Sequence, residues 1–181
     1  MKDLRLNSFL GIDFGSSQEI AKEILITRKG ASLDEENSSD TALLFEDIKF
    51  AGRDAISVIL LFVDDKFAKS AVYIEPKLDA YILNMYLEIK NELNSKYFVT
   101  QDDFENYEEP YEKDDGHTET GISIGKISIS SFWSFPDSNG GLDDFIALSI
   151  SDELEIVINY EDGDLADEMS NKINEENSLD Y

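Results

Sequence analysis

The chain has 181 residues, 41% of them hydrophobic and 11% aromatic, which suits a packed core and argues against wholesale disorder. It has no cysteine, so disulfides, thiolate catalysis and cysteine-ligated metal sites are excluded. A formal net charge of −25 disfavours direct contact with nucleic acid or an anionic membrane, and favours basic proteins or cations as partners.

The charge is unevenly distributed along the chain. Residues 1–97 carry 12 basic and 17 acidic side chains, whereas residues 98–181 carry 3 basic and 23 acidic ones, a net charge of −20. One interpretation is that this charge keeps the protein soluble or reflects a host with an acidic proteome. The other is that the second half attracts a basic partner.

The first segments predict a helix, a loop and a strand. A helix is expected over Ser17–Thr27, with Ser16 as its N-cap and with Ile20, Ile24 and Leu25 as its buried residues. The polar stretch Ser32–Thr41 is expected to be a loop, and Ala42–Phe50 a strand. The start of the chain has no long apolar h-region after Met1, so we expect a cytoplasmic protein.

The stretch Ala55–Ile74 organises the predicted fold. Two apolar runs, Ile56–Val63 and Ala71–Ile74, flank the polar residues 64–66, a pattern typical of a β-hairpin. Both faces of the first run are apolar, which predicts a central strand that is covered on both sides.

A second helix is expected over Ala80–Lys96, capped by Asp79. Its apolar residues recur every three or four positions and form one wide stripe. The stripe consists of Ile82, Met85, Tyr86, Ile89 and Leu93. This helix should cover one face of the sheet.

The composition changes at Val99–Glu119, which contains nine acidic residues and one lysine and is expected to be an ordered loop. Three further strands are expected over Gly121–Trp133, with a β-bulge or a tight bend near Gly125, and over Phe145–Ile150 and Leu154–Tyr160. The acidic tail at 162–181 has weak helical spacing, which leaves one helix open as an alternative.

These elements predict the α+β class: a mainly antiparallel sheet covered by two helices, with a C-terminal β-meander. Residues 1–161 should form a single domain, with a sub-boundary near 98–119 as an alternative, and residues 162–181 an acidic tail. The order of elements leaves open whether the last three strands extend the first sheet or build a second layer.

No catalytic or cofactor motif is present, and we predict that the protein is not an enzyme. His117 is the only histidine, and no nucleophile elbow or GxGxxG phosphate loop accompanies it. Hydrolysis by a pair of carboxylates remains an alternative, although 40 acidic residues give no reason to select any pair. The acidic groups near Asp102, Asp114 and Asp162 lack calcium-loop spacing, so neither a metal nor a cofactor is predicted.

The candidate partner-binding site is an acidic segment interleaved with aromatic residues. Carboxylates attract Arg and Lys, and aromatic rings provide anchor area. In the alternative interpretation, the rings fold inward and hold the loop in place. The candidate residues are Asp102, Asp103, Phe104, Glu105, Tyr107, Glu108, Glu109, Tyr111, Glu112, Asp114 and Asp115.

Two families of binding proteins resemble this chain. The glycine and Ser-Ser-Gln-Glu at 15–19, followed by VILLFVDDKFAKSAVYI, resemble modules of the β-lactamase-inhibitor-protein type over about residues 11–74. The small, cysteine-free, very acidic α+β chain as a whole is similar to bacterial immunity proteins. Both resemblances imply a protein that binds and blocks another protein.

The sequence therefore predicts an acidic protein-binding domain, an intracellular immunity protein or inhibitor that occludes a basic partner such as a cognate toxin. An alternative is a mimic of nucleic acid that blocks a DNA- or RNA-binding protein, which requires carboxylates spaced like phosphates. A carboxylate-based hydrolase is the third hypothesis.

Overall fold

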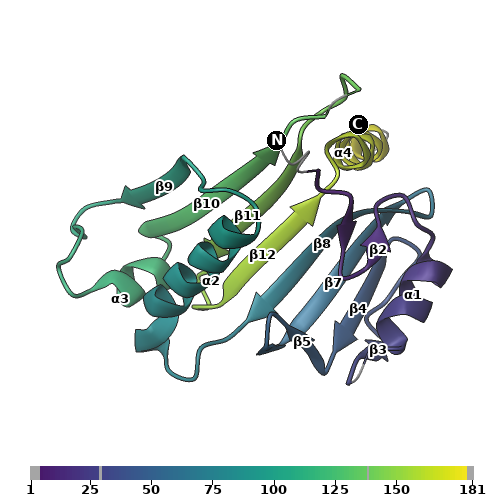
Figure 1. Cartoon of the computed structure of the whole chain (residues 1–181). Coiled ribbons are helices and arrows are strands. Elements are labelled where there is room, and N and C mark those ends of the chain that lie inside the picture. Colours follow the sequence, from purple (N-terminus) through teal and green to yellow (C-terminus); the bar gives the residue numbers. More distant parts are fainter. Residues whose placement is uncertain (1–4, 29, 138, 179–181) are drawn as a thin grey trace.

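The computed structural model describes residues 5–28, 30–137 and 139–178, so the ends of the predicted domain and tail at 1–4 and 179–181 lie outside the described residues. The described chain forms one eight-stranded antiparallel sheet, two small sheets and four α-helices (Figure 1). In spatial order the large sheet contains β3 (Ser32–Asp34), β4 (Ala42–Glu46), β7 (Ser57–Val63), β8 (Lys66–Ile74), β12 (Ile156–Glu161), β11 (Asp144–Ile150), β10 (Ile127–Phe135) and β9 (Asp102–Tyr107). The helices are α1 (Gln18–Ile26), α2 (Ile82–Lys96), α3 (Thr118–Ser123) and α4 (Gly163–Ser178). The small sheets pair β1 (Ser8–Phe9) with β2 (Ile12–Asp13), and β5 (Ile48–Phe50) with β6 (Arg53–Ala55).

The predicted α+β class with a mainly antiparallel sheet is confirmed. The question left open by the sequence is also answered, because β12 pairs with β8 and joins the two halves of the chain in one sheet. Ile158 lies opposite Val72 in this pairing, and neither side chain is exposed. β10, β11 and β12 pair in succession on the far side of that junction.

The hairpin of β7 and β8 turns at Asp64 and Asp65, whose φ angles of 47° and 57° are those of a tight two-residue turn. Val58 and Leu60 are fully buried on one face of β7, whereas Ile59 on the other face is only half-buried. The predicted central position of this strand is confirmed, whereas its second face is covered only in part. We call the buried side the inner face of the sheet and the other side the open face.

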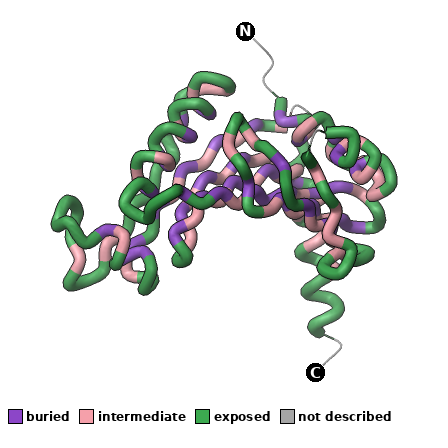
Figure 2. Tube along the Cα trace, turned by 90° about the horizontal axis from the view of Figure 1, so that it is seen from below, coloured by how far each residue is buried: buried purple, intermediate pink, exposed green. Residues whose placement is uncertain are grey.

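The inner face carries most of the core. Figure 2 shows α4 on the opposite side of the sheet from α1 and α2. The two helices that the sequence predicts as the cover of the sheet account for its inner face only. A further helix, α4, packs on the open face against β7, β8 and β11. No helix in the described part of the chain is both long and apolar enough to cross a bilayer.

Helix α2 lies over β11 and β12 and buries Ile82, Tyr86, Ile89 and Leu93, as its spacing predicts. Met85 is only partly buried against the same core. The predicted cap is wrong: Asp79 starts a short 3₁₀ turn, η1 (Asp79–Tyr81), and no side chain caps either helix start.

Helix α1 differs from its prediction in its cap and its buried face. Ser17, rather than Ser16, is the N-cap, and its hydroxyl accepts a hydrogen bond from the Ile20 backbone N–H at 3.4 Å. The helix buries Ala21 and Leu25, whereas the Ile20 side chain is 48% exposed. Ala21 and Leu25 are four residues apart and therefore lie on the same face of the helix, the face that is turned to the core.

Two segments between α1 and the hairpin also differ from their predictions. The expected loop at 32–41 begins with an edge strand, β3, which pairs with β4. The single strand expected over Ala42–Phe50 is broken at Asp47, whose φ of 52° ends β4 and directs β5 into a separate hairpin. Arg53 belongs to β6, and its guanidinium donates a hydrogen bond to the carboxylate of Glu92 on α2 at 2.7 Å.

The expected loop at 99–119 instead contains the edge strand β9. The strand expected over Gly121–Trp133 begins only at Ile127, because its first residues form α3. Gly121 lets this short helix approach β10 and the loop: an added Cβ would lie 2.4 Å from Ile127 Cδ1 and 3.2 Å from Tyr111 Cδ1. The acidic tail is helical as α4, the alternative left open by its spacing.

Candidate protein-binding surface

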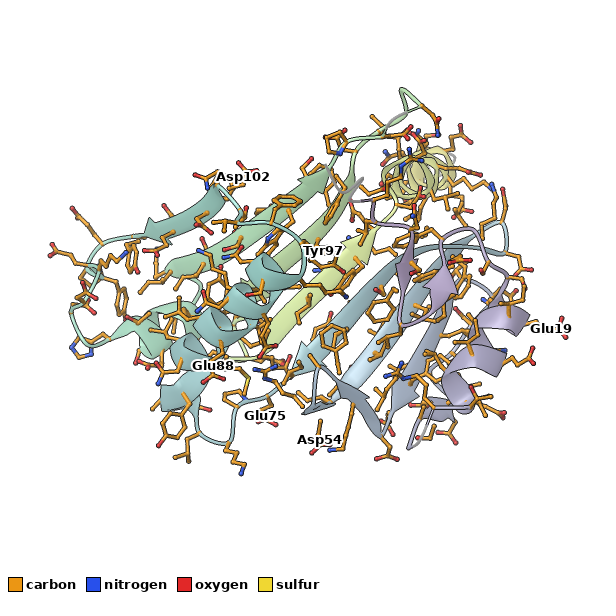
Figure 3. All side chains as sticks on the ribbon, in the orientation of Figure 1. Glu19, Asp54, Glu75, Glu88, Tyr97 and Asp102 are labelled. Carbon is orange, nitrogen blue, oxygen red and sulfur yellow. The ribbon has the colours of Figure 1, made fainter. Side chains whose placement is uncertain are left out.

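The strand β9 forms one outer edge of the sheet, and no other element of the described chain lies beyond it (Figure 1). Asp102, at the start of this strand, points away from the body of the molecule (Figure 3). Asp102, Phe104 and Asn106 share a face with Phe132 and the rest of the open face, whereas Asp103, Glu105 and Tyr107 lie on the inner-face side. We call residues 102–115 the acidic edge segment.

Asp103 anchors the edge strand to the core. Its carboxylate lies 2.7 Å from Lys90 Nζ of α2 and accepts a hydrogen bond from Ser131 Oγ at 2.5 Å. Ser131 Oγ in turn lies 2.6 Å from the Tyr86 hydroxyl. Partial burial opposes ionisation of Asp103, but the hydrogen bonds from Lys90 and Ser131 keep its pKa below the ordinary value. This candidate residue therefore contributes to the fold.

Two further candidate carboxylates are paired with lysines. Glu105 lies 2.7 Å from Lys113 Nζ, and Glu108 lies 2.6 Å from Lys126 Nζ. These lysines and Lys172, which pairs with Asp64, are the three basic residues of the second half of the chain. All three cations are thus engaged within the molecule.

The remaining carboxylates of the acidic edge segment divide into two kinds. Asp115 accepts hydrogen bonds from the backbone N–H groups of Glu112 and His117, at 3.0 and 2.8 Å, and shapes the loop. Within the described residues, the carboxylates of four exposed acids have neither a hydrogen-bond partner nor an ion-pair partner. They are Asp102, Glu109, Glu112 and Asp114.

The aromatic residues of the segment point in different directions. Tyr107 and Tyr111 are half-buried and pack against the hydrophobic core, which matches the interpretation that rings hold the loop in place. Phe104 is 58% exposed and touches only the edge of the open face, where its ring meets Phe132 at a centroid distance of 5.6 Å. Phe104 is therefore the aromatic residue of the segment that a partner can reach.

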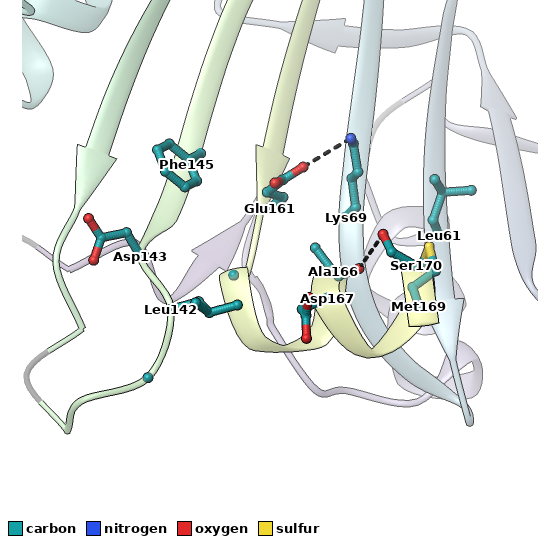
Figure 4. A pocket seen from close by; sticks show the side chains of 12 residues that line it. Leu61, Lys69, Leu142, Asp143, Phe145, Glu161, Ala166, Asp167, Met169 and Ser170 are labelled. Carbon is teal, nitrogen blue, oxygen red and sulfur yellow. Dashed lines mark hydrogen bonds and ion pairs between the residues drawn. The ribbon is translucent and has the colours of Figure 1, made fainter. Parts of the chain in front are cut away.

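A groove of about 710 Å³ runs between α4 and the open face (Figure 4). Its apolar walls include Leu61, Phe145 and Met169, and a smaller hollow that shares Phe145 extends it to Phe132. At its centre Lys69 Nζ lies 2.9 Å from Glu161, so this charge pair is satisfied within the groove. The groove and Phe104 together make one half-covered apolar surface across the sheet.

Sequence reasoning missed this groove. The sequence shows the apolar second face of β7, and the signal that could have extended it to a groove is the apolar residues Phe132 and Phe145, which alternate with buried residues on β10 and β11. A strand with one solvated face normally carries polar residues there.

The acidic cluster at the start of α4 stabilises backbone structure. Asp162 accepts the Leu165 N–H at 2.9 Å, Asp164 accepts the Leu142 N–H at 2.9 Å, and Asp144 accepts the Gly163 N–H at 2.9 Å. Among the residues described, no group of three potential ligands is arranged to hold a metal ion.

We expect Asp144→Asn to stabilise the protein at pH 7. Burial, with smaller contributions from nearby carboxylates, raises the pKa of Asp144 to about 6 from an ordinary value of 3.8. The folded state therefore binds this proton more tightly, and stability falls as pH rises from about 4 to 6 and stays lower above that range. Because the side chain is partly solvated, we expect the variant to gain only about 1 kcal/mol at pH 7 and to lose part of this pH dependence.

Asparagine keeps the acceptor for the Gly163 N–H, so the comparison isolates the charge. Chemical denaturation at pH 4 and pH 7 measures the effect. Asp40→Asn, at an exposed site, serves as the control and should change stability by less than about 0.5 kcal/mol. Equal stabilities of Asp144→Asn and the parent at pH 7 would contradict the expectation.

His117, the only histidine, is exposed at the start of α3, where its backbone carbonyl accepts the Gly121 N–H at 2.9 Å.

Comparisons of the chain with protein-family models, curated proteins and solved structures found no match. The surface is accordingly interpreted from its own residues.

Proposed function

We propose that this chain is a non-enzymatic, cytoplasmic protein-binding domain, an inhibitor or immunity protein that occludes a basic partner such as a toxin. One observation carries the proposal. Four carboxylates of the acidic edge segment lack a side-chain partner in the described chain, and the same segment carries the exposed ring of Phe104. The lysines of the second half do not neutralise them, because each is paired elsewhere.

This combination suits capture of a basic surface. Carboxylates without cations create a field that speeds the encounter with a positively charged protein. An exposed aromatic ring on the same segment offers area that becomes buried on contact and slows dissociation. Asp103, Glu105 and Glu108 have a different role. The lysine partners of Asp103 and Glu108 tie the segment to the rest of the fold, and Glu105 pairs with Lys113 within the segment.

Affinity capture from cells of the source organism, followed by mass spectrometry, tests the proposal. We expect a basic protein that is retained by the parent chain and lost from a variant carrying Phe104→Ala, Glu109→Gln and Glu112→Gln. A captured DNA- or RNA-binding protein whose nucleic-acid site is blocked would instead support the nucleic-acid mimic. Equal capture by the parent and the variant would contradict an interface on the acidic edge segment.

A further inference from the structure

We propose that the partner binds by adding a β-strand to the free edge of β9. The proposal rests on the proposed function and specifies how the partner is recognised. The added segment would be extended and basic, and it would make the sheet one strand wider.

The backbone of β9 presents a row of free groups at this edge. The Glu108 N–H donates to the Lys126 carbonyl at 2.9 Å, which makes this pair the hydrogen-bonded type of the antiparallel ladder. Since the types alternate, Phe104 and Asn106 also direct their backbone groups to β10. The N–H and C=O groups of Asp103, Glu105 and Tyr107 therefore point outward, and no partner for them occurs among the described residues.

The opposite edge of the sheet is a poorer template. β3 has only three residues, whereas β9 has six. All residues of β9 except Tyr107 are exposed. Proteins protect free edges with charge, bulges or short strands, because an unpaired strand recruits another. β9 has regular pairing with β10 along its length and is protected only by acidic side chains. Negative charge repels most strands but attracts a basic one.

The side chains of β9 specify the segment that fits. Asp102 and Phe104 are successive side chains on the open face of this edge, so an added strand would place its own side chains directly beside them. A lysine or arginine next to Asp102 and an apolar residue next to Phe104 would be complementary to this face. The predicted ligand is thus an extended segment that has a basic and an apolar residue two positions apart, on the same face of the added strand.

A short synthetic peptide that repeats the unit lysine-threonine-valine-threonine probes this edge in the full chain, because it places lysine and valine two positions apart on one face. In the free protein we expect fast amide exchange at Asp103, Glu105 and Tyr107, and slow exchange at Phe104 and Asn106. Peptide binding should slow exchange at the three outward amides, as measured by NMR. The same peptide with glutamate in place of lysine should not do so.

Two substitutions at one site separate strand addition from charge attraction. Glu105→Gln removes the carboxylate and keeps the outward N–H. Glu105→Pro removes both the carboxylate and the N–H, and because this N–H points outward, the hydrogen bonds between β9 and β10 are kept. Both variants lose the pair with Lys113. We expect Glu105→Pro to bind the basic peptide about tenfold more weakly than Glu105→Gln, a difference of about 1.4 kcal/mol. Circular dichroism should show that both variants are folded.

The outcomes separate the binding mode from the function. Binding that leaves the outward amides of β9 unprotected, or that is equal for Glu105→Pro and Glu105→Gln, would overturn strand addition while leaving capture of a basic partner in place. A basic peptide that fails to bind, together with a basic partner that is not captured from cells, would overturn both proposals.

Discussion

Leu60→Ala should destabilise the protein by about 2–5 kcal/mol, because it leaves a cavity in the inner core. Leu60 is fully buried on β7 in the main hydrophobic cluster. Ile89→Ala, on the facing side of α2, should cost a similar amount, since Ile89 is only 2% exposed. Chemical denaturation measures both free energies of unfolding.

Ile59→Ala is the matched control for Leu60→Ala. Ile59 is the neighbouring residue on the same strand, but its side chain lies on the open face and is half-buried. Its truncation should cost no more than about 1 kcal/mol. A cost below about 0.5 kcal/mol for Leu60→Ala, or equal costs at the two positions, would show that the inner and open faces are wrongly assigned.

Phe104→Ala should raise the dissociation rate of the captured partner about thirtyfold. This corresponds to about 2 kcal/mol, the loss expected when a central aromatic anchor is truncated. Phe104 is 58% exposed in the free chain, so its removal should leave stability nearly unchanged. Surface plasmon resonance measures the dissociation, and thermal denaturation checks the fold.

Leu87→Ala provides the control for the Phe104 variant. Leu87 is 53% exposed, but it lies on α2, which covers the inner face. Its truncation should leave the dissociation rate unchanged. If both variants dissociate at the parent rate, Phe104 is not an anchor and the interface lies outside the edge strand.

The strongest periodic patterns predicted the fold correctly. The spacing of Ile82, Tyr86, Ile89 and Leu93 identified the buried stripe of α2, and the apolar runs around Asp64 identified the central hairpin. In these segments the local pattern and the tertiary packing require the same residues, so the pattern alone was sufficient.

Edge and junction segments could not be predicted in the same way. Five of the six residues of β9 are exposed, so the strand has no apolar alternation and exists because β10 supplies the ladder. In the sequence, Ile122 and Ile124 alternate with polar residues as the residues of β10 do. In the structure Ile122 lies in α3 and is buried, whereas Ile124 is the C-cap of α3 and is 58% exposed. The pairing of a partner strand and the packing of a short helix are tertiary effects.

The candidate site was located by composition, but its internal roles were not. Acidic and aromatic content marked residues 102–115, and charge counting indicated an unneutralised surface. Which carboxylates are free depends on Lys90, Lys113 and Lys126, and pairing with Lys90 crosses from α2 to the edge strand. Likewise, only the register of β9 shows that Phe104 points outward while Tyr107 packs inward.

The association rate of the captured partner at low and high salt tests the central claim most directly. The parent should be compared with the double variant Glu109→Gln and Glu112→Gln, which removes two unpaired charges from the acidic edge segment. The control is Glu35→Gln and Glu36→Gln, which removes two exposed charges next to β3 at the other edge of the sheet. We expect the first pair to slow association about threefold at low salt, with the difference vanishing at high salt because ions screen the field. Equal association rates for both double variants and the parent, or rates insensitive to salt, would contradict an acidic edge that captures a basic partner.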